Sequence, residues 1–400
     1  MRAIAWMIPL ALISLPGCND RGADKGNAQQ QPGATKSAAT PASGADAMAS
    51  QDPGPGQAVR PAVADTEQRP VMQMQVVLDR LGFSPGVIDG KEGLSLGNAL
   101  GGFQKANNLP QTGKPDQATL QMLSRWSNIP ATRVVTIPED FARGPFAPVP
   151  KEPADQAKMP QLGYASLDEK LAERFHTTIE TLHMLNPGGA PAGAQAAPVA
   201  AAQPAPAPSP NASSAPGTPP PPMFRAGQQI RVPNTGADAL DPAGIDDQTW
   251  LGTLRDLGVG SSQPKVDKVV VSKSKGTLSA YDGDKLVAVF TVTTGSSHDP
   301  LPIGKWEVKG VAHNPPFHYN PDLFWDADSK EEKQKLPPGP NGPVGVVWID
   351  LSKPHYGIHG TPEPQTIGRA QSHGCVRLTN WDAARLAQMV HSGTVALFEK

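Results

Sequence analysis

Two long tracts rich in Ala, Pro, Gly and Ser divide this chain of 400 residues and decide what it can fold into. The first runs from Asn19 to about Pro70, and the second runs from Gly188 to Pro222. Both contain almost no large apolar side chains, so neither can bury enough surface to offset the conformational entropy lost on ordering. We therefore predict disordered linkers at 19–70 and 188–222, and a multidomain protein in place of one large domain.

Residues 1–18 have the pattern of a secretory leader. Arg2 precedes an apolar run from Ala3 to Leu15, which is too short for a permanent membrane span. The run ends in the sequence LPGC, which resembles a bacterial lipobox, so Cys18 is predicted to carry a lipid. The lipid would anchor the chain to a membrane facing the periplasm. An ordinary signal peptide with an incidental cysteine is the alternative.

Residues 71–124 are predicted to form a small all-α domain. Apolar residues recur at helical spacing in three places, around residues 74–81, 96–103 and 117–123. The order of these helices and of the loop motif GVIDG between them resembles the three-helix peptidoglycan-binding domain of wall enzymes. Gly97, Gly101 and Gly102 fall inside the second helix, where each costs up to about 1 kcal/mol, so we expect that helix to be weak or partly broken. A helical spacer without a ligand is the alternative.

Residues 161–234 predict a second, α+β module. An amphipathic helix begins after Tyr164, a second helix follows Thr177, and a strand lies between Phe224 and Asn234. Together with the sequence LNPG after the second helix, this order resembles a LysM glycan-binding module, interrupted by the linker at 188–222. His176 and His183 are interpreted as surface residues of these helices.

From Val266 onward the pattern changes to β-rich segments, with one helix from Trp381 to Val390 and Thr379 or Asn380 as its cap. The sequence predicts a mainly β domain over 265–400. An irregular insertion, 314–343, is rich in Pro and aromatic residues and is typical of a lid or a binding loop.

The chemistry concentrates in this last third of the chain. Cys375, the only cysteine outside the leader, follows His359 by 16 positions. A lone thiol in an exported protein is an oxidation hazard, so its presence suggests a thiolate function, which requires a base. Gly374 lets the backbone approach a substrate, and its N–H with that of Cys375 could form an oxyanion hole. Arg377 lies on the same side of an extended segment as Cys375 and could hold a carboxylate.

The motifs IHGT at 358–361 and SHGCVRL at 372–378 are similar to those of the L,D-transpeptidase (YkuD-type) catalytic domain. The resemblance implies Cys375 as the nucleophile, His359 as proton donor and acceptor, and the Gly360 carbonyl as the group that orients His359. It implies that the protein forms 3→3 crosslinks in peptidoglycan through a thioester, with release of terminal D-Ala and without a metal or cofactor. The residues assigned to substrate binding are Arg377, His373 and Ser372.

Several alternatives stay open. Water as the acceptor would make the enzyme an L,D-carboxypeptidase, and an envelope protein as the acceptor would make it a protein-to-peptidoglycan transferase. A wall-binding anchor without catalysis is a different class of function. His359, His373 and Cys375 could instead ligate zinc, and Cys375 could be an inert buried thiol. The net charge of −2 gives no reason to expect nucleic acid as a partner.

Overall fold

The computed structural model describes residues 65–193, 222–236, 240–323, 331–370, 372 and 374–400. The predicted leader with Cys18 lies outside these residues, as do most of both predicted linkers and His373. The end of the first predicted linker belongs to the described structure, because the Thr132 hydroxyl donates to the Asp65 carboxylate at 2.6 Å. Within the described ranges, no helix combines the length and the apolarity needed to cross a bilayer.

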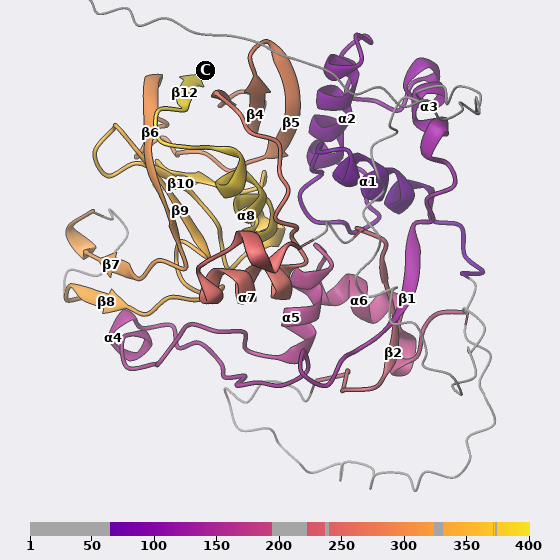
Figure 1. Ribbon diagram of the computed structural model, residues 1–400, viewed down its shortest axis with the longest axis horizontal. Coiled ribbons are helices and arrows are strands. Elements are labelled where there is room, and N and C mark those ends of the chain that lie inside the picture. Colours follow the sequence, from indigo (N-terminus) through magenta and orange to yellow (C-terminus); the bar gives the residue numbers. More distant parts are fainter. Residues whose placement is uncertain (1–64, 194–221, 237–239, 324–330, 371, 373) are drawn as a thin grey trace, which may run out of the picture. The chain divides into compact units, whose positions relative to one another are not determined.

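The first part of the described chain is helical, as predicted. It contains α1 (Pro70–Arg80), α2 (Leu94–Ala106), α3 (Gln117–Leu123) and the short 3₁₀ helix η1 (Ser124–Trp126) (Figure 1). The expectation of a broken second helix is wrong, since α2 is continuous over 13 residues. A Cβ atom on Gly102 would lie 2.7 Å from Val289 Cγ2. This glycine therefore permits close packing against a strand, and that contact compensates for its low helix propensity.

The strand in question is β5 (Lys285–Thr291), which lies at one edge of the large sheet. The Ser84 amide donates to the Val289 carbonyl at 2.8 Å, and the Val289 amide donates to the Gly82 carbonyl at 3.0 Å. Phe83 lies in one apolar cluster with Leu286 and Val289. The helical domain thus covers an edge strand that would otherwise present unpaired backbone groups.

The second part of the chain contains the two predicted helices and the predicted strand. Its elements are β1 (Thr132–Thr136), α4 (Pro153–Gln156), α5 (Leu167–Arg174), α6 (Ile179–Leu185), η2 (Pro187–Gly189) and β2 (Gln229–Pro233). Ser166 and Thr178 cap α5 and α6 through their hydroxyls. The sequence analysis missed β1, which pairs with β2 in antiparallel orientation.

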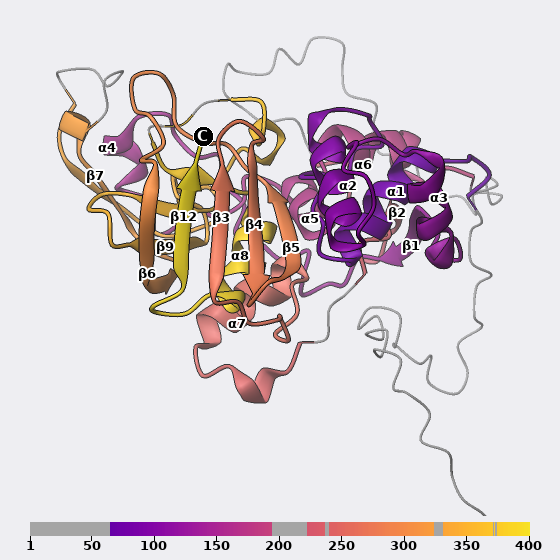
Figure 2. The ribbon, with the colours of Figure 1, turned by 90° about the horizontal axis from the view of Figure 1, so that it is seen from above.

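The C-terminal part is mainly β, as predicted. Its eight-stranded sheet has the order β11-β10-β9-β6-β12-β3-β4-β5, and Figure 2 shows β6, β12, β3, β4 and β5 side by side. The strands are β3 (Lys268–Ser272), β4 (Thr277–Asp282), β5, β6 (Gly304–His313), β9 (Val347–Leu351), β10 (Gly357–His359), β11 (Val376–Arg377) and β12 (Val395–Glu399). The predicted insertion carries a separate hairpin of β7 (Phe317–Tyr319) and β8 (Gln334–Leu336). Short 3₁₀ helices occur at Pro242–Gly244, Pro321–Leu323 and Pro364–Thr366.

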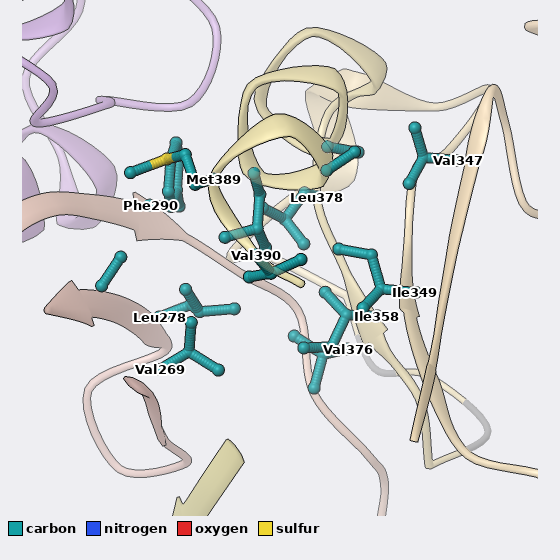
Figure 3. Close-up of a cluster of buried hydrophobic side chains, with 14 of the residues drawn as sticks. Val269, Leu278, Phe290, Val347, Ile349, Ile358, Val376, Leu378, Met389 and Val390 are labelled. Atoms are coloured by element: carbon teal, nitrogen blue, oxygen red, sulfur yellow. The ribbon is translucent and has the colours of Figure 1, made fainter. Parts of the chain in front are cut away.

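Two helices pack with this sheet in one apolar core (Figure 3). The helix α8 (Asn380–Met389) was predicted, and its N-cap is Thr379. The helix α7 (Gln248–Leu257) precedes the predicted domain, yet Trp250 and Leu254 lie in the same core. The core anchors the short strands β10 and β11 through Ile358 and Val376, and these strands carry the candidate site.

The interpretation of His176 as a surface residue is wrong, since the side chain is only 2% exposed. Its ring stacks on Trp381 of α8 with centroids 4.5 Å apart. Its Nδ1 lies 3.3 Å from Asp79 Oδ1 of α1, and its Nε2 lies 3.7 Å from Asp382 Oδ2 of α8. His176 therefore joins three parts of the chain, and helical periodicity cannot foresee partners from other domains. His183 is partly exposed and pairs with Asp168 at 2.8 Å.

Candidate active site

Two short parallel strands bring the predicted catalytic residues together. In the pairing of β10 with β11, Ile358 lies opposite Val376 and His359 lies opposite Arg377. Residues opposite each other in a sheet project to the same face, and so do alternate residues along one extended segment. Cys375, Arg377 and His359 therefore share one face, although 16 positions of sequence separate the thiol from the imidazole.

His359 is held in one orientation from two sides. Its Nδ1 lies 2.7 Å from the Gly360 carbonyl oxygen, and its ring stacks on Trp348 with centroids 5.6 Å apart. A carbonyl can only accept a hydrogen bond, so Nδ1 carries the proton and Nε2 keeps its lone pair. This tautomer suits a general base that acts through Nε2.

The electrostatic environment keeps His359 neutral. Burial lowers the pKa of this imidazole, the positive charge of Arg377 lowers it further, and the bond to Gly360 only partly opposes them, so the pKa falls to about 3. A group with this pKa is uncharged at neutral pH. Both ring nitrogens therefore do not carry protons at once at neutral pH, and Nε2 is unprotonated.

Cys375 immediately precedes β11 and is partly exposed. Its Sγ lies 3.9 Å from the His355 carbonyl oxygen, to which the thiol donates. Burial raises the pKa of the thiol, while a backbone hydrogen bond at Gly357 and the charge of Arg377 lower it less. Before any substrate binds, the thiol of Cys375 and the imidazole of His359 are thus both uncharged at neutral pH.

The turn before Cys375 is fixed by its neighbours. Ser372 is buried, and its hydroxyl donates to the Cys375 carbonyl at 2.5 Å. Gly374 has φ +95°, and a Cβ atom there would lie 2.7 Å from the Tyr356 ring, so only glycine fits without strain. The Arg377 amide donates to the Thr293 carbonyl at 2.9 Å. These contacts orient the thiol, while the substrate-binding roles of Ser372 and Arg377 and the oxyanion role of Gly374 stay predictions.

Three side chains that were not predicted from the sequence shape the site. Trp348 stacks on His359, and Tyr356 lies against Gly374. Asn380 packs against Gly360. Trp348 lies directly across from His359 in the pairing of β9 with β10. Alternation along the predicted strand could have indicated which face of the sheet Trp348 occupies. It could not have indicated that His359 lies beside it.

Of the three residues that could ligate zinc, His359, His373 and Cys375, the second lies outside the described residues. Among the residues that are described, one group of His, Cys, Asp and Glu side chains is close enough to hold a metal ion, and it consists of Asp79, His176 and Asp382. His176 Nδ1 faces Asp79, while Nε2 lies 3.1 Å from the Thr379 hydroxyl and 3.7 Å from Asp382. This arrangement suits an imidazolium between two anions better than one metal ion bound to one nitrogen.

Comparison with known proteins assigns the family. The family model described as the YkuD "L,D-transpeptidase catalytic domain" matches residues 267–397. The model described as "Putative peptidoglycan binding domain" matches residues 67–123. A relative from Fuscovulum blasticum, "Putative L,D-transpeptidase in ATP synthase subunits region ORF 5", is 46% identical over 42% of this chain and 88% of its own length. The chain belongs to the L,D-transpeptidase family.

Other relatives match over smaller shares. "Putative L,D-transpeptidase YkuD" of Bacillus licheniformis is 33% identical over 32% of this chain, and "Probable L,D-transpeptidase YbiS" of Escherichia coli K12 is 28% identical over 41%. The chain spans 62% of the Bacillus licheniformis relative and 53% of the Escherichia coli relative. Among solved structures, L,D-transpeptidase 3 of Mycobacterium tuberculosis aligns with 44% of this chain and 76% of its own, at 15% identity and a TM-score of 0.29.

Proposed function

We propose that the protein is a cysteine-dependent L,D-transpeptidase that forms 3→3 crosslinks in peptidoglycan. The observation that carries the proposal is the placement of a neutral His359 on the same face as Cys375, with Nδ1 bonded to Gly360 and Nε2 left as the base. A nucleophile, its base and a third group that orients the base are the parts that covalent acyl transfer requires.

In the first half of the reaction, the Cys375 sulfur attacks the carbonyl of the L-centre of the third residue in a tetrapeptide stem. His359 Nε2 takes the thiol proton as the C–S bond forms. The N–H groups of Gly374 and Cys375 stabilise the oxyanion. The bond to the terminal D-Ala nitrogen then breaks, and His359 returns the proton to that amine. The products are a thioester and free D-Ala.

In the second half, an amine on a neighbouring stem attacks the thioester. His359 takes the proton of that amine, the C–S bond breaks, and the thiol recovers a proton. The positive charge of Arg377, which acts on both Cys375 and His359, would hold a stem carboxylate, and His373 would shape the same region. Water in place of the amine gives a tripeptide, and a lysine of an envelope protein gives a protein–peptidoglycan conjugate.

The other modules fit a protein that works at the wall. The match to a peptidoglycan-binding domain over 67–123 supports peptidoglycan as the partner. The two helices and the strand that resemble a LysM module are present as α5, α6 and β2, which supports glycan binding there. We place the protein in the periplasm, anchored through a lipid on Cys18. Mass spectrometry of the mature N-terminus tests the anchor, and an unmodified Cys18 or cleavage elsewhere would contradict it.

The test of the reaction uses residues 19–400, which omit Cys18, with a disaccharide-tetrapeptide as substrate and mass spectrometry as the readout. We expect a dimer that has lost one D-Ala, and no such product from Cys375→Ala or His359→Ala. Tripeptide alone would identify a carboxypeptidase. Absence of both products, with no thioester on Cys375, would exclude transpeptidation between stems and favour a protein acceptor or a wall-binding anchor.

A further inference from the structure

The side chain of Asn380 connects the candidate active site with α5 of the preceding module. Asn380 is the first residue of α8 and is 0% exposed. Its Nδ2 donates to Glu173 Oε1 at 2.7 Å and to the Pro340 carbonyl at 3.0 Å. Its Oδ1 accepts the Val346 amide at 3.1 Å. Three hydrogen bonds to three separate segments leave this amide group a single orientation.

Asn380 in turn packs against the residue that orients the base. A Cβ atom on Gly360 would lie 2.2 Å from Asn380 Oδ1, so the Gly360 backbone is in direct contact with the amide group. The carbonyl of the same Gly360 accepts the hydrogen bond from His359 Nδ1. A rotation of the Asn380 side chain therefore cannot occur without moving the peptide that fixes the His359 ring.

Glu173 determines which way Asn380 faces. Its carboxylate receives the shorter of the two Nδ2 bonds, 2.7 Å against 3.0 Å to the Pro340 carbonyl. Glu173 Oε2 is shielded from solvent. Without the Glu173 acceptor, Asn380 keeps the Pro340 carbonyl and the Val346 amide as partners, so its orientation against Gly360 is held by two hydrogen bonds in place of three.

We propose that Glu173 is a positioning residue for His359, acting through Asn380 and the Gly360 peptide. The inference rests on the proposed function, in which His359 is the catalytic base. It makes α5, a helix outside the catalytic domain, part of the machinery that sets the direction of Nε2. Neither Glu173 nor Asn380 touches the reacting atoms in this scheme.

The test compares three variants of residues 19–400 in the tetrapeptide assay. Glu173→Ala removes the acceptor, and we expect kcat to fall about five- to tenfold, the worth of about one hydrogen bond, with KM changed less than about twofold. Glu173→Gln keeps an oxygen that accepts from Asn380 Nδ2, so its kcat is expected within about twofold of the wild type.

The matched control is Glu169→Ala. Glu169 lies on the same helix and accepts a hydrogen bond of the same kind from Asn341 Nδ2 at 2.8 Å, which also joins α5 to the C-terminal part of the chain. Its loss removes that contact and the hydrogen bond from the Ala165 amide, but it leaves the Glu173 acceptor of Asn380 in place. We expect a loss of stability similar to that of Glu173→Ala, with kcat unchanged. An equal fall of kcat in both variants would overturn the proposal, because general loosening would then explain it.

A second readout separates this inference from the proposed function. NMR of protein labelled at histidine reports the His359 Nδ1–H proton and ring nitrogens without any substrate. We expect Glu173→Ala to shift these signals and Glu169→Ala to leave them in place. If the wild type forms no crosslink yet the shift occurs, the function fails and the positioning stands. Unchanged His359 signals in Glu173→Ala, or a Glu173→Gln variant as impaired as Glu173→Ala, would overturn the positioning role.

Discussion

Replacing His176 with asparagine tests the buried contact that joins α1 and α8 to the segment after α5. Asparagine tolerates the positive φ of +49° that His176 adopts, so the backbone need not change. The substitution removes both ring nitrogens, which face Asp79 and Asp382. It also removes the ring that stacks on Trp381. Two carboxylates are then left buried without a cation between them.

The size of the effect follows from this burial. Asp79 and Asp382 are both 0% exposed, and three of their four carboxylate oxygens accept no hydrogen bond from the described residues. Removing one partner of a buried ion pair costs about 3–5 kcal/mol, because the remaining charge stays desolvated. The Ser84 hydroxyl still donates to Asp382 at 2.8 Å. We therefore expect a loss near the lower limit, about 3 kcal/mol in the free energy of unfolding.

The pH dependence has a definite sign. Burial lowers the pKa of His176, but the charges of Asp382 and Asp79 outweigh it and the pKa is raised above 6.5, despite the opposing charge of Arg385. Glu173 is a further acidic group near His176, and the charge of His176 lowers the pKa of Glu173. A raised folded pKa gives stabilisation that is complete below the unfolded value of about 6.5 and is lost as pH rises through the folded value. Burial also raises the pKa of Asp382, which acts in the same direction.

Urea unfolding at about pH 6 and about pH 9 measures both quantities. The wild type should lose stability between these two values, and His176→Asn should lose less because it lacks the imidazolium contribution. His318→Asn is the control, since His318 is exposed on β7. The double variant with Asp79→Asn and His176→Asn should recover part of the lost unfolding free energy, because it removes one buried carboxylate that has no cation beside it. A loss in His176→Asn no larger than that of His318→Asn would refute the reasoning.

Two further predictions concern the thiol and the covered sheet edge. Alkylation of Cys375 by iodoacetamide should reach half its maximal rate at a pH above the ordinary thiol pKa of about 8.5, because burial raises the pKa of this thiol. Arg377→Ala should raise that midpoint pH further, because the charge of Arg377 lowers the thiol pKa. A midpoint below about pH 8 would contradict this prediction. Gly102→Leu should destabilise the protein by about 1–3 kcal/mol in urea unfolding, since its Cβ would overlap Val289. Val289→Ala should recover part of that loss, and an additive double variant would argue against the contact.

Local signals in the sequence predicted most of the elements. The caps Ser166, Thr178 and Thr379 mark helices that begin at the next residue, because a side-chain acceptor at a helix N-terminus is a local property. The strand β1 was missed because its partner is far away in sequence, with Thr132 opposite Pro233. A five-residue segment without a neighbouring hairpin carries little strand signal of its own.

The candidate site was predictable in part for the same reason. Spacing and motif indicated Cys375 and His359, and the pairing of β10 with β11 places them on one face. The resemblance indicated the Gly360 carbonyl, which lies 2.7 Å from His359 Nδ1. It did not indicate Trp348, which stacks on the imidazole from β9, or Asn380, which packs against Gly360 from α8. The sequence around Trp348 and Asn380 shows ordinary core and cap residues, and only the tertiary fold brings them to the candidate site.

Contacts between modules explain two residues that look unfavourable within their own module. One is a glycine inside a helix, and the other is a buried histidine. Gly102 weakens α2 as an isolated helix, yet it permits the contact with Val289 that covers β5. His176 is costly to bury alone, yet it lies between Asp79 and Asp382 from two other parts of the chain. A residue that destabilises its own module, but finds its contact partner in another module, makes the stability of each module depend on the other. We therefore expect the isolated C-terminal domain to be less stable than the same domain in the whole chain. On its own it would expose the edge of β5 to solvent and leave the Asp382 carboxylate without His176.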